Sequence, residues 1–235
     1  MTKTRITLFA AAALTLAAIA FALVPSGREE FPGVVSIETT ATYKDTQLLE
    51  KAWALPVAAA YRSAIFDYQR NASVCGPTSV VDIMRSLGRP QNQETVLDGA
   101  DVWTLFGYVV PAGMTLDEVA ALLHLRTGQP VKILRDLDLA AFRAELPHMN
   151  DPARRYLVNF TRGPLFGRGH GHHSPILGYL PDEDLVFIGD VNRDYAGPWL
   201  VKAERLFAAI DTIDDSSGKK RGLLAMTVPG PTPSP

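Results

Sequence analysis

The order of hydrophobic patterns along the chain constrains its fold more than any other feature. Before residue 150 most apolar residues recur with helical spacing, and Gly or Pro ends several of these patterns. After residue 150 they form short runs bounded by Gly, Pro or charged residues, which is typical of strands. The patterns predict helices over 45–55, 75–87, 116–127, 139–146 and 202–210, and strands over 35–37, 131–134, 156–160, 174–179, 185–189 and 223–227. Helices first and a sheet second indicate an α+β fold.

Three further segments follow from local signals. Residues 61–69 are expected to form an irregular or extended segment before the helix at 75–87, and residues 91–111 are expected to be rich in turns. Thr115 with Glu118 three residues later is a capping box, and Gly128 is expected to end the helix that it begins.

Cys75, the only cysteine among the 235 residues, stands at the start of the helix expected at 75–87. The positive end of a helix dipole lowers the pKa of a thiol on the first turn and favours the nucleophilic thiolate. A buried cysteine acting as a small hydrophobic residue is the commoner alternative. In an oxidising compartment one cysteine cannot form an intramolecular disulfide, so its presence needs another reason.

A cysteine nucleophile requires a base and a third group that orients the base. Three of the five histidines, His170, His172 and His173, lie together just before an expected strand. Asp190 lies at the end of the next expected strand, and residues 181–184 predict the turn of an antiparallel hairpin. Such a hairpin would bring His172 near Asp190, although residue types alone do not choose among the three histidines. The chain order Cys, His, Asp is the papain-type order.

Gln69 lies six residues before Cys75, where a side-chain donor could complete an oxyanion hole. An ordinary polar loop residue is the alternative. A nucleophile at the head of the first long helix, followed by a sheet, matches the plan of papain-like cysteine proteases. We therefore expect an N-terminal helical part packed on an antiparallel sheet.

The histidines at 170–173 also suggest a zinc or copper site. Adjacent histidines on a strand point to opposite faces, and the sequence holds no second cluster of Cys or His. We therefore predict no dedicated metal site. A non-enzymatic exported protein that binds metal through His170–His173 remains an alternative.

Net charge limits the possible partners of the protein, and the N-terminal residues indicate its compartment. With 23 basic and 25 acidic residues and no basic stripe, nucleic acid is not an expected partner. Lys3 and Arg5 precede an apolar run that ends near an A-x-A site at Ala20–Ala22. We expect an export signal, cleaved or kept as a membrane anchor, that places the protein in the periplasm or on the periplasmic side of the cytoplasmic membrane. The expected organisation is a signal or anchor (1–24), a linker (25–43), a catalytic domain (44–228) and a disordered tail (229–235).

Four stretches carry a resemblance to a known family. These are Gln69–Ser79, with a Gln, five residues and Cys-Gly; Gly113–Glu118, reading Gly-Met-Thr-Leu-Asp-Glu; Tyr156–Pro175, ending in Gly-His-His-Ser-Pro; and Asp190–Val201, with Asp-Val-Asn-Arg and a later Trp-Leu-Val. In order and spacing they resemble the phytochelatin synthase family, in particular its short bacterial members that consist of the catalytic domain alone. The resemblance covers roughly residues 69–227.

The resemblance implies a papain-like enzyme that cleaves the Cys–Gly bond of glutathione and releases glycine. A γ-glutamylcysteinyl thioester on the enzyme then passes to a second glutathione or to water. It implies Cys75 as the nucleophile, His172 as the general base and acid, Asp190 as the orienting carboxylate and Gln69 as the oxyanion donor.

The resemblance also implies residues that bind the substrate. A γ-glutamyl group carries a carboxylate and an ammonium, which call for an arginine and an acidic residue. Arg162, Asp214 and Arg221 match the family's substrate-binding positions, and Arg193 matches a further arginine near the active site. Solvated surface charges are the alternative for all four.

The sequence departs from the family pattern in ways that affect function. His173 stands where Phe or Ile is usual, and the stretch from Arg193 to Trp199 is about one residue shorter than usual. The sequence has no counterpart of the Cys-rich C-terminal region of the plant enzymes, so water is the acceptor that we expect more often. We expect no intrinsic cofactor, and a heavy-metal (Cd or Zn) glutathione thiolate would act as substrate or activator.

The sequence leaves two questions open. An exported papain-like peptidase acting on other peptides is an alternative enzyme, which differs in cleaving α-linked rather than γ-linked substrates. The sequence is compatible with a monomer and with a homodimer.

Overall fold

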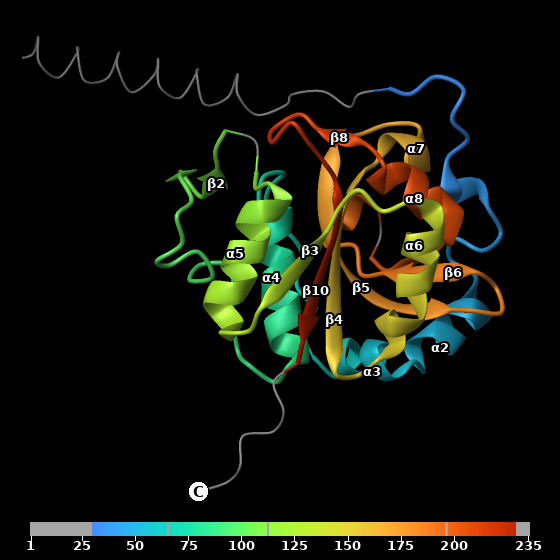
Figure 1. The fold of residues 1–235 in the computed structure, drawn as a ribbon, viewed down its shortest axis with the longest axis horizontal. Coiled ribbons are helices and arrows are strands. Elements are labelled where there is room, and N and C mark those ends of the chain that lie inside the picture. The colour runs from blue at the N-terminus through green and yellow to red at the C-terminus, as the bar shows by residue number, and fades with distance from the viewer. Residues whose placement is uncertain (1–29, 65, 112, 196, 229–235) are drawn as a thin grey trace, which may run out of the picture.

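The computed structural model describes residues 30–64, 66–111, 113–195 and 197–228. The expected signal or anchor (1–24) and the expected tail (229–235) lie outside these residues. The described chain has an α+β fold in which helices pack on both faces of an antiparallel sheet (Figure 1). This confirms the fold class predicted from the order of the sequence patterns.

The elements have the following bounds. The helices are α2 (Thr46–Trp53), α3 (Pro56–Ser63), α4 (Cys75–Ser86), α5 (Leu116–Thr127), α6 (Leu139–Glu145), α7 (Gly163–Phe166) and α8 (Ala203–Ile210), with short 3-10 helices η1 (Ile37–Thr39), η2 (Leu146–Asn150) and η3 (Arg193–Tyr195). The strands are β1 (Thr104–Leu105), β2 (Tyr108–Val109), β3 (Val131–Leu134), β4 (Arg154–Thr161), β5 (Gly171–Leu180), β6 (Leu185–Ile188), β7 (Trp199–Lys202), β8 (Ile213–Asp214), β9 (Lys219–Lys220) and β10 (Gly222–Thr227).

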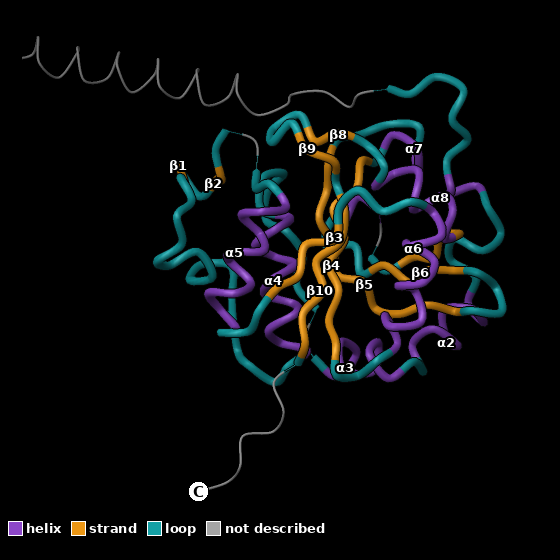
Figure 2. The backbone as a smooth tube through the Cα atoms, viewed as in Figure 1, coloured by secondary structure: helices purple, strands orange, loops and turns teal. Residues whose placement is uncertain are grey.

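A six-stranded antiparallel sheet in the order β3-β10-β4-β5-β6-β7 forms the centre of the molecule (Figure 2). Because strand side chains alternate between faces, β4 supplies two separate cores. Leu157 belongs to the core shared with α3, α4 and α5, whereas Tyr156 and Val158 belong to the core shared with α6 and α8. Figure 1 shows α4 and α5 on one side of these strands and α6 and α8 on the other.

Most predicted elements are confirmed, and two predictions are wrong. Residues 35–37 do not form a strand, because Ser36 caps η1 by accepting a hydrogen bond from the backbone N–H of Glu38. Residues 61–63 are helical rather than irregular, because they form the last turn of α3. Pro56, expected only to end the preceding helix, also begins this one. Proline is well tolerated at a first helical position, where its missing N–H would have no partner in any case.

Over the described ranges, whose internal gaps are residues 65, 112 and 196, the structure contains no helix of the length and apolar character needed to cross a membrane.

The predicted capping box of α5 is present and offers a test of the fold. The backbone N–H of Glu118 donates to Oγ1 of Thr115 (3.3 Å), and the backbone N–H of Thr115 donates to Oε2 of Glu118 (2.7 Å). We expect Thr115→Ala to lower the free energy of unfolding by about 1 kcal/mol, measured by urea denaturation. Thr115→Ser keeps the hydroxyl and should retain most of that stability. Equal losses in both variants would show that the cap is not the cause.

Candidate active site

Cys75 is the first residue of α4, and its free thiol is buried. The helix is held against β5 because the hydroxyl of Ser79 donates to the backbone oxygen of His173 (3.1 Å). A side chain at Gly76 would place its Cβ 2.7 Å from Cγ2 of Val119, so the residue after Cys75 must be small for α4 and α5 to pack this closely. The start of α4 is thereby fixed over the sheet.

The predicted partners of Cys75 meet at one end of the sheet. His172 lies near the start of β5 and Asp190 follows β6, and the two strands are antiparallel. Nε2 of His172 donates to Oδ1 of Asp190 (3.0 Å), and both side chains are buried. The predicted hairpin of β5 and β6 therefore brings His172 and Asp190 together.

The carboxylate of Asp190 is fully buried, and its described neighbours supply several hydrogen bonds. Oδ1 also accepts from Nη2 of Arg162 (2.9 Å) and from the backbone N–H of Asn192 (2.9 Å), and Oδ2 accepts from Nε1 of Trp199 (2.9 Å). Burial raises the pKa of Asp190, but the charges and hydrogen bonds of Arg162 and His172 lower it by a larger amount. The pKa of Asp190 therefore lies well below its usual range. Asp190 is therefore a fixed negative charge behind His172.

Two histidines influence the thiol of Cys75. Nδ1 of His173 lies 3.8 Å from Sγ, and Nε2 of the same ring lies 2.9 Å from Nδ2 of Asn159. Burial raises the pKa of Cys75, but hydrogen bonds and charges of His172 and His173 lower it more, so that it falls well below its usual value. Burial and Arg162 lower the pKa of His172, but Asp190 and Cys75 raise it more. The two shifts favour a thiolate–imidazolium pair.

A cavity of about 530 Å³ opens beside Cys75. This volume is in the range of small-molecule sites. Its lining includes Phe31, Cys75, Met114, Asn159, His170, His173, Asp214 and Arg221. The ring of Phe31 also covers Gly163, where an added Cβ would lie 2.4 Å from ring atoms, and the backbone N–H of Phe31 donates to the oxygen of Gly167 (2.8 Å). The N-terminal segment thus forms part of the cavity wall.

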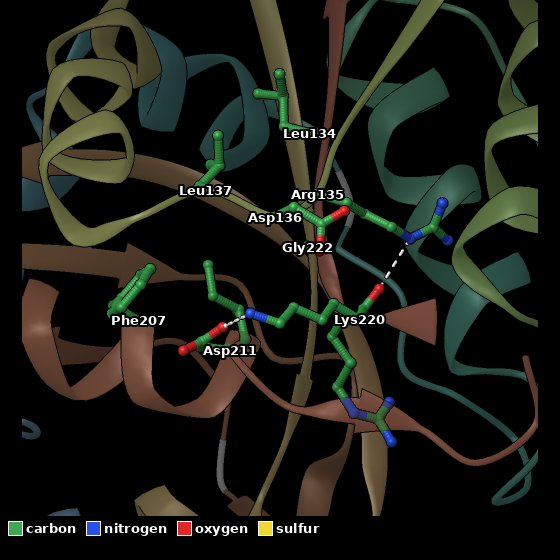
Figure 3. Close-up of a pocket in the computed structure, with 10 residues that line it drawn as sticks. Leu134, Arg135, Asp136, Leu137, Phe207, Asp211, Lys220 and Gly222 are labelled. Atoms are coloured by element: carbon green, nitrogen blue, oxygen red, sulfur yellow. Dashed lines mark hydrogen bonds and ion pairs between the residues drawn. The ribbon is translucent and has the colours of Figure 1, made fainter. Parts of the chain in front are cut away.

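Two predicted substrate-binding residues lie in this cavity. Nη2 of Arg221 lies 3.4 Å from Oδ1 of Asp214, and both side chains are largely buried. Figure 3 shows a second hollow, which Arg221 also lines. There Nε of Arg135 donates to the backbone oxygen of Lys220 (2.8 Å), and Lys220 pairs with Asp211 (2.6 Å). That hollow holds only about 10 Å³, about the space of one water, so it is too small for a peptide substrate.

The structure places the other two predicted arginines outside this cavity. Arg162 lies behind the triad, paired with Asp190 and with its guanidinium 3.5 Å from the ring centroid of Tyr195. Arg193 is exposed, and its guanidinium lies 5.0 Å from the ring centroid of Tyr68. The predicted roles of these two arginines in substrate binding remain predictions.

Gln69 lies close to the triad segment, because its backbone N–H donates to the oxygen of Val191 (2.8 Å). Its side-chain Oε1 is buried and has no hydrogen-bond partner among the described residues. This atom can only accept a hydrogen bond, whereas donation to an oxyanion would use the Nε2 amide of the same side chain. The predicted role of Gln69 as oxyanion donor remains a prediction.

Within the described part of the chain, no three side chains of His, Cys, Asp or Glu are grouped so as to hold a metal ion. The ring of His172 turns to Asp190, whereas that of His173 turns to Asn159.

Sequence reasoning did not single out Asn159, Trp199 or Tyr195. Alternation along β4 could have placed Asn159 on the face toward α4, since Leu157 lies there, but its partner His173 becomes apparent only from the β4–β5 register. Trp199 was recognised only as part of a strand motif. No sequence signal places its indole on Asp190.

Comparison with known proteins identifies the family of the chain. The family described as "Phytochelatin synthase" matches residues 34–223. A glutathione gamma-glutamylcysteinyltransferase 1 of Triticum aestivum is 29% identical over 182 residues, covering 72% of this chain and 36% of that protein. The enzyme of the same name from Arabidopsis thaliana is 28% identical over 177 residues, covering 70% of this chain and 36% of that protein. The chain thus spans about a third of the length of these relatives.

Two solved structures are similar in outline. The peptidase domain of Streptococcus ComA, a bi-functional ABC transporter, has 15% identity and a TM-score of 0.47, covering 70% of this chain and 97% of that one. A C39-like peptidase from Bacillus anthracis has 12% identity and a TM-score of 0.48, covering 70% of this chain and 94% of that one. The family assignment depends on the sequence match alone, which extends over most of the chain. The chain belongs to the phytochelatin synthase family.

Proposed function

We propose that this protein is a thiol enzyme that cleaves glycine from glutathione through a γ-glutamylcysteinyl thioester on Cys75. The acyl group then passes to a second glutathione or, more often, to water. The observation that carries the proposal is the buried Cys75–His172–Asp190 arrangement, with a cavity of about 530 Å³ beside the sulfur. The names of the Triticum and Arabidopsis relatives support glutathione as the substrate.

The first half-reaction uses the thiolate–imidazolium pair. The Cys75 thiolate attacks the carbonyl carbon of the substrate's Cys–Gly bond, and the carbonyl oxygen takes the negative charge. As the oxyanion collapses, the C–N bond breaks and the His172 imidazolium gives its proton to the departing amine of glycine. The products are free glycine and a thioester on Cys75. The side-chain amide of Gln69 is the proposed donor to the oxyanion.

The second half-reaction reverses the proton movement. Neutral His172 takes a proton from the attacking water, or from the amino group of a second glutathione, as either attacks the thioester carbon. The C–S bond then breaks and the thiolate re-forms beside the imidazolium. Water gives γ-glutamylcysteine, and a second glutathione gives a peptide longer by one γ-glutamylcysteinyl unit.

Charges in the cavity support recognition of a γ-glutamyl group. Its free α-carboxylate suits the guanidinium of Arg221, and its ammonium suits the carboxylates of Asp214 and Asp215, all of which line the cavity. Arg221 and Asp214 are held by each other and are largely buried, so little side-chain freedom is lost on binding. A heavy-metal thiolate of glutathione is proposed as a further form of the substrate.

The proposed compartment depends on the sequence of residues 1–24. A basic flank followed by an apolar run and an A-x-A site supports export, with the enzyme in the periplasm or anchored facing it. Glutathione or a related γ-glutamyl peptide would then be met outside the cytoplasm.

The first test is release of glycine from glutathione by the purified protein, quantified by mass spectrometry of the products. We expect Cys75→Ala to lower the turnover rate by at least about 1,000-fold, because the thiol that forms the thioester is lost. His148→Gln changes an exposed imidazole of η2 and should keep the wild-type rate. Glycine release by wild type at the Cys75→Ala rate would refute the proposal. Equal cleavage of an α-linked Glu-Cys-Gly peptide would refute the γ-glutamyl specificity.

The second test uses two buried charges that act on His172 in opposite directions. Turnover needs deprotonated Cys75 and protonated His172, so kcat/KM against pH should be bell-shaped, and the basic limb should report the pKa of His172. Asp190 raises that pKa and Arg162 lowers it. We therefore expect Asp190→Asn to move the basic limb to lower pH and Arg162→Gln to move it to higher pH.

Each of these variants removes one partner of a buried ion pair, which costs up to about 3–5 kcal/mol of stability. Circular dichroism at the assay temperature confirms that the variants compared are folded. Movement of the basic limb in the same direction in both folded variants would contradict the assignment of that limb to His172.

A further inference from the structure

His173 contacts the nucleophile from the face of the sheet that α4 covers. In the register between β4 and β5, His173 lies opposite Asn159, two residues beyond Leu157, which packs in the core shared with α4. Its Nδ1 lies 3.8 Å from Sγ of Cys75, and the residue is 3% exposed. His172 lies opposite Phe160 and turns to Asp190. The proposed function uses only His172.

The partners of His173 determine which ring nitrogen carries the proton. Nη1 of Arg221 donates to Oδ1 of Asn159 (3.2 Å), and a guanidinium can only donate. The amide of Asn159 must therefore turn its oxygen to Arg221 and its nitrogen to His173. That nitrogen donates to Nε2 of His173 (2.9 Å), so the proton of the neutral ring is on Nδ1, the atom that faces the sulfur.

The two histidines thus differ in the proton each holds. The ionised carboxylate of Asp190 only accepts, so Nε2 of His172 carries a proton and its Nδ1 is the basic nitrogen of the neutral ring. His172 can take a proton from the thiol. His173 instead presents an N–H to the sulfur and can stabilise the thiolate without taking its proton.

We propose that His173 is a second catalytic residue, a hydrogen-bond donor to the Cys75 thiolate whose tautomer is set by Arg221 through Asn159. Its part in turnover rests on the proposed function. The N–H stabilises the thiolate before attack and again when the thiolate leaves the thioester carbon. It therefore favours breakdown of the acyl-enzyme, whichever acceptor attacks.

Several groups face the sulfur and bear on its titration. His172 and His173 come from β5. His172 is backed by Asp190 and Arg162. His173 is backed by Asn159, which contacts Arg221, and Arg221 pairs with Asp214. The positive end of α4 adds to their effect. A test must therefore alter the donor while leaving these charges in place.

The test is the pH dependence of the rate at which iodoacetamide alkylates the full chain. Cys75 is the only thiol, so the rate reports on one sulfur and needs no substrate. In His173→Gln the amide lies where Nε2 lay and its Oε1 can accept from Asn159, but no N–H occupies the position of Nδ1. In His173→Asn the amide N–H lies near the position of Nδ1.

We expect His173→Gln to raise the midpoint of the alkylation profile by about one pH unit, because a charge-assisted hydrogen bond to the thiolate is lost. His173→Asn should restore most of the shift, and His148→Gln should give the wild-type midpoint. A wild-type midpoint in His173→Gln, or equal midpoints in His173→Gln and His173→Asn, would overturn the proposal.

A measurement on the unaltered protein guards against misfolded variants. Long-range ¹H–¹⁵N correlation of histidine-labelled wild type shows which nitrogen of the His173 ring carries the proton. A proton on Nδ1 is expected, and a neutral ring protonated on Nε2 would overturn the proposal. If the alkylation profiles shift as expected but no glycine is released from glutathione, the proposed function fails and the donor role of His173 stands.

Discussion

The rest of the site depends on the hydrogen bonds and ion pairs that surround the buried carboxylate of Asp190. An ionised group without water is tolerated only where donors surround it, and here they come from separate parts of the chain. Arg162 follows β4, His172 lies on β5 and Trp199 begins β7. Satisfying one charge therefore fixes the ends of three strands relative to one another, close to the start of the helix that carries Cys75.

The sulfur of Cys75 lies between two polar assemblies that belong to opposite faces of the same sheet. One joins His172 to Asp190 and Arg162, and the other joins His173 to Asn159 and Arg221. A strand sends neighbouring side chains to opposite faces, and near the start of β5 the head of α4 brings one atom within reach of both. This geometry explains how adjacent histidines can serve one sulfur while meeting different partners.

The sequence predicted the architecture well because its evidence was local. The capping box at Thr115, the turn at 181–184 and the apolar runs of the strands each depend on residues close together in the chain. The pairing of His172 with Asp190 was also within reach, since one hairpin produces it. Pairings across several elements, such as the indole of Trp199 on Asp190 or the amide of Asn159 on His173, depend on strand register and side-chain rotamers. For the same reason Arg162, expected to bind substrate, could not be placed behind the triad in advance.

Phe31 gives the N-terminal segment a part in the site that its position in the sequence does not suggest. The family match begins at residue 34, three positions after this ring, yet Phe31 lines the cavity and covers Gly163. A shortened protein starting at residue 34 would keep Cys75, His172 and Asp190 and lose part of the cavity wall. Trimming this chain to the matched domain would therefore change the shape of its pocket as well as the length of the protein.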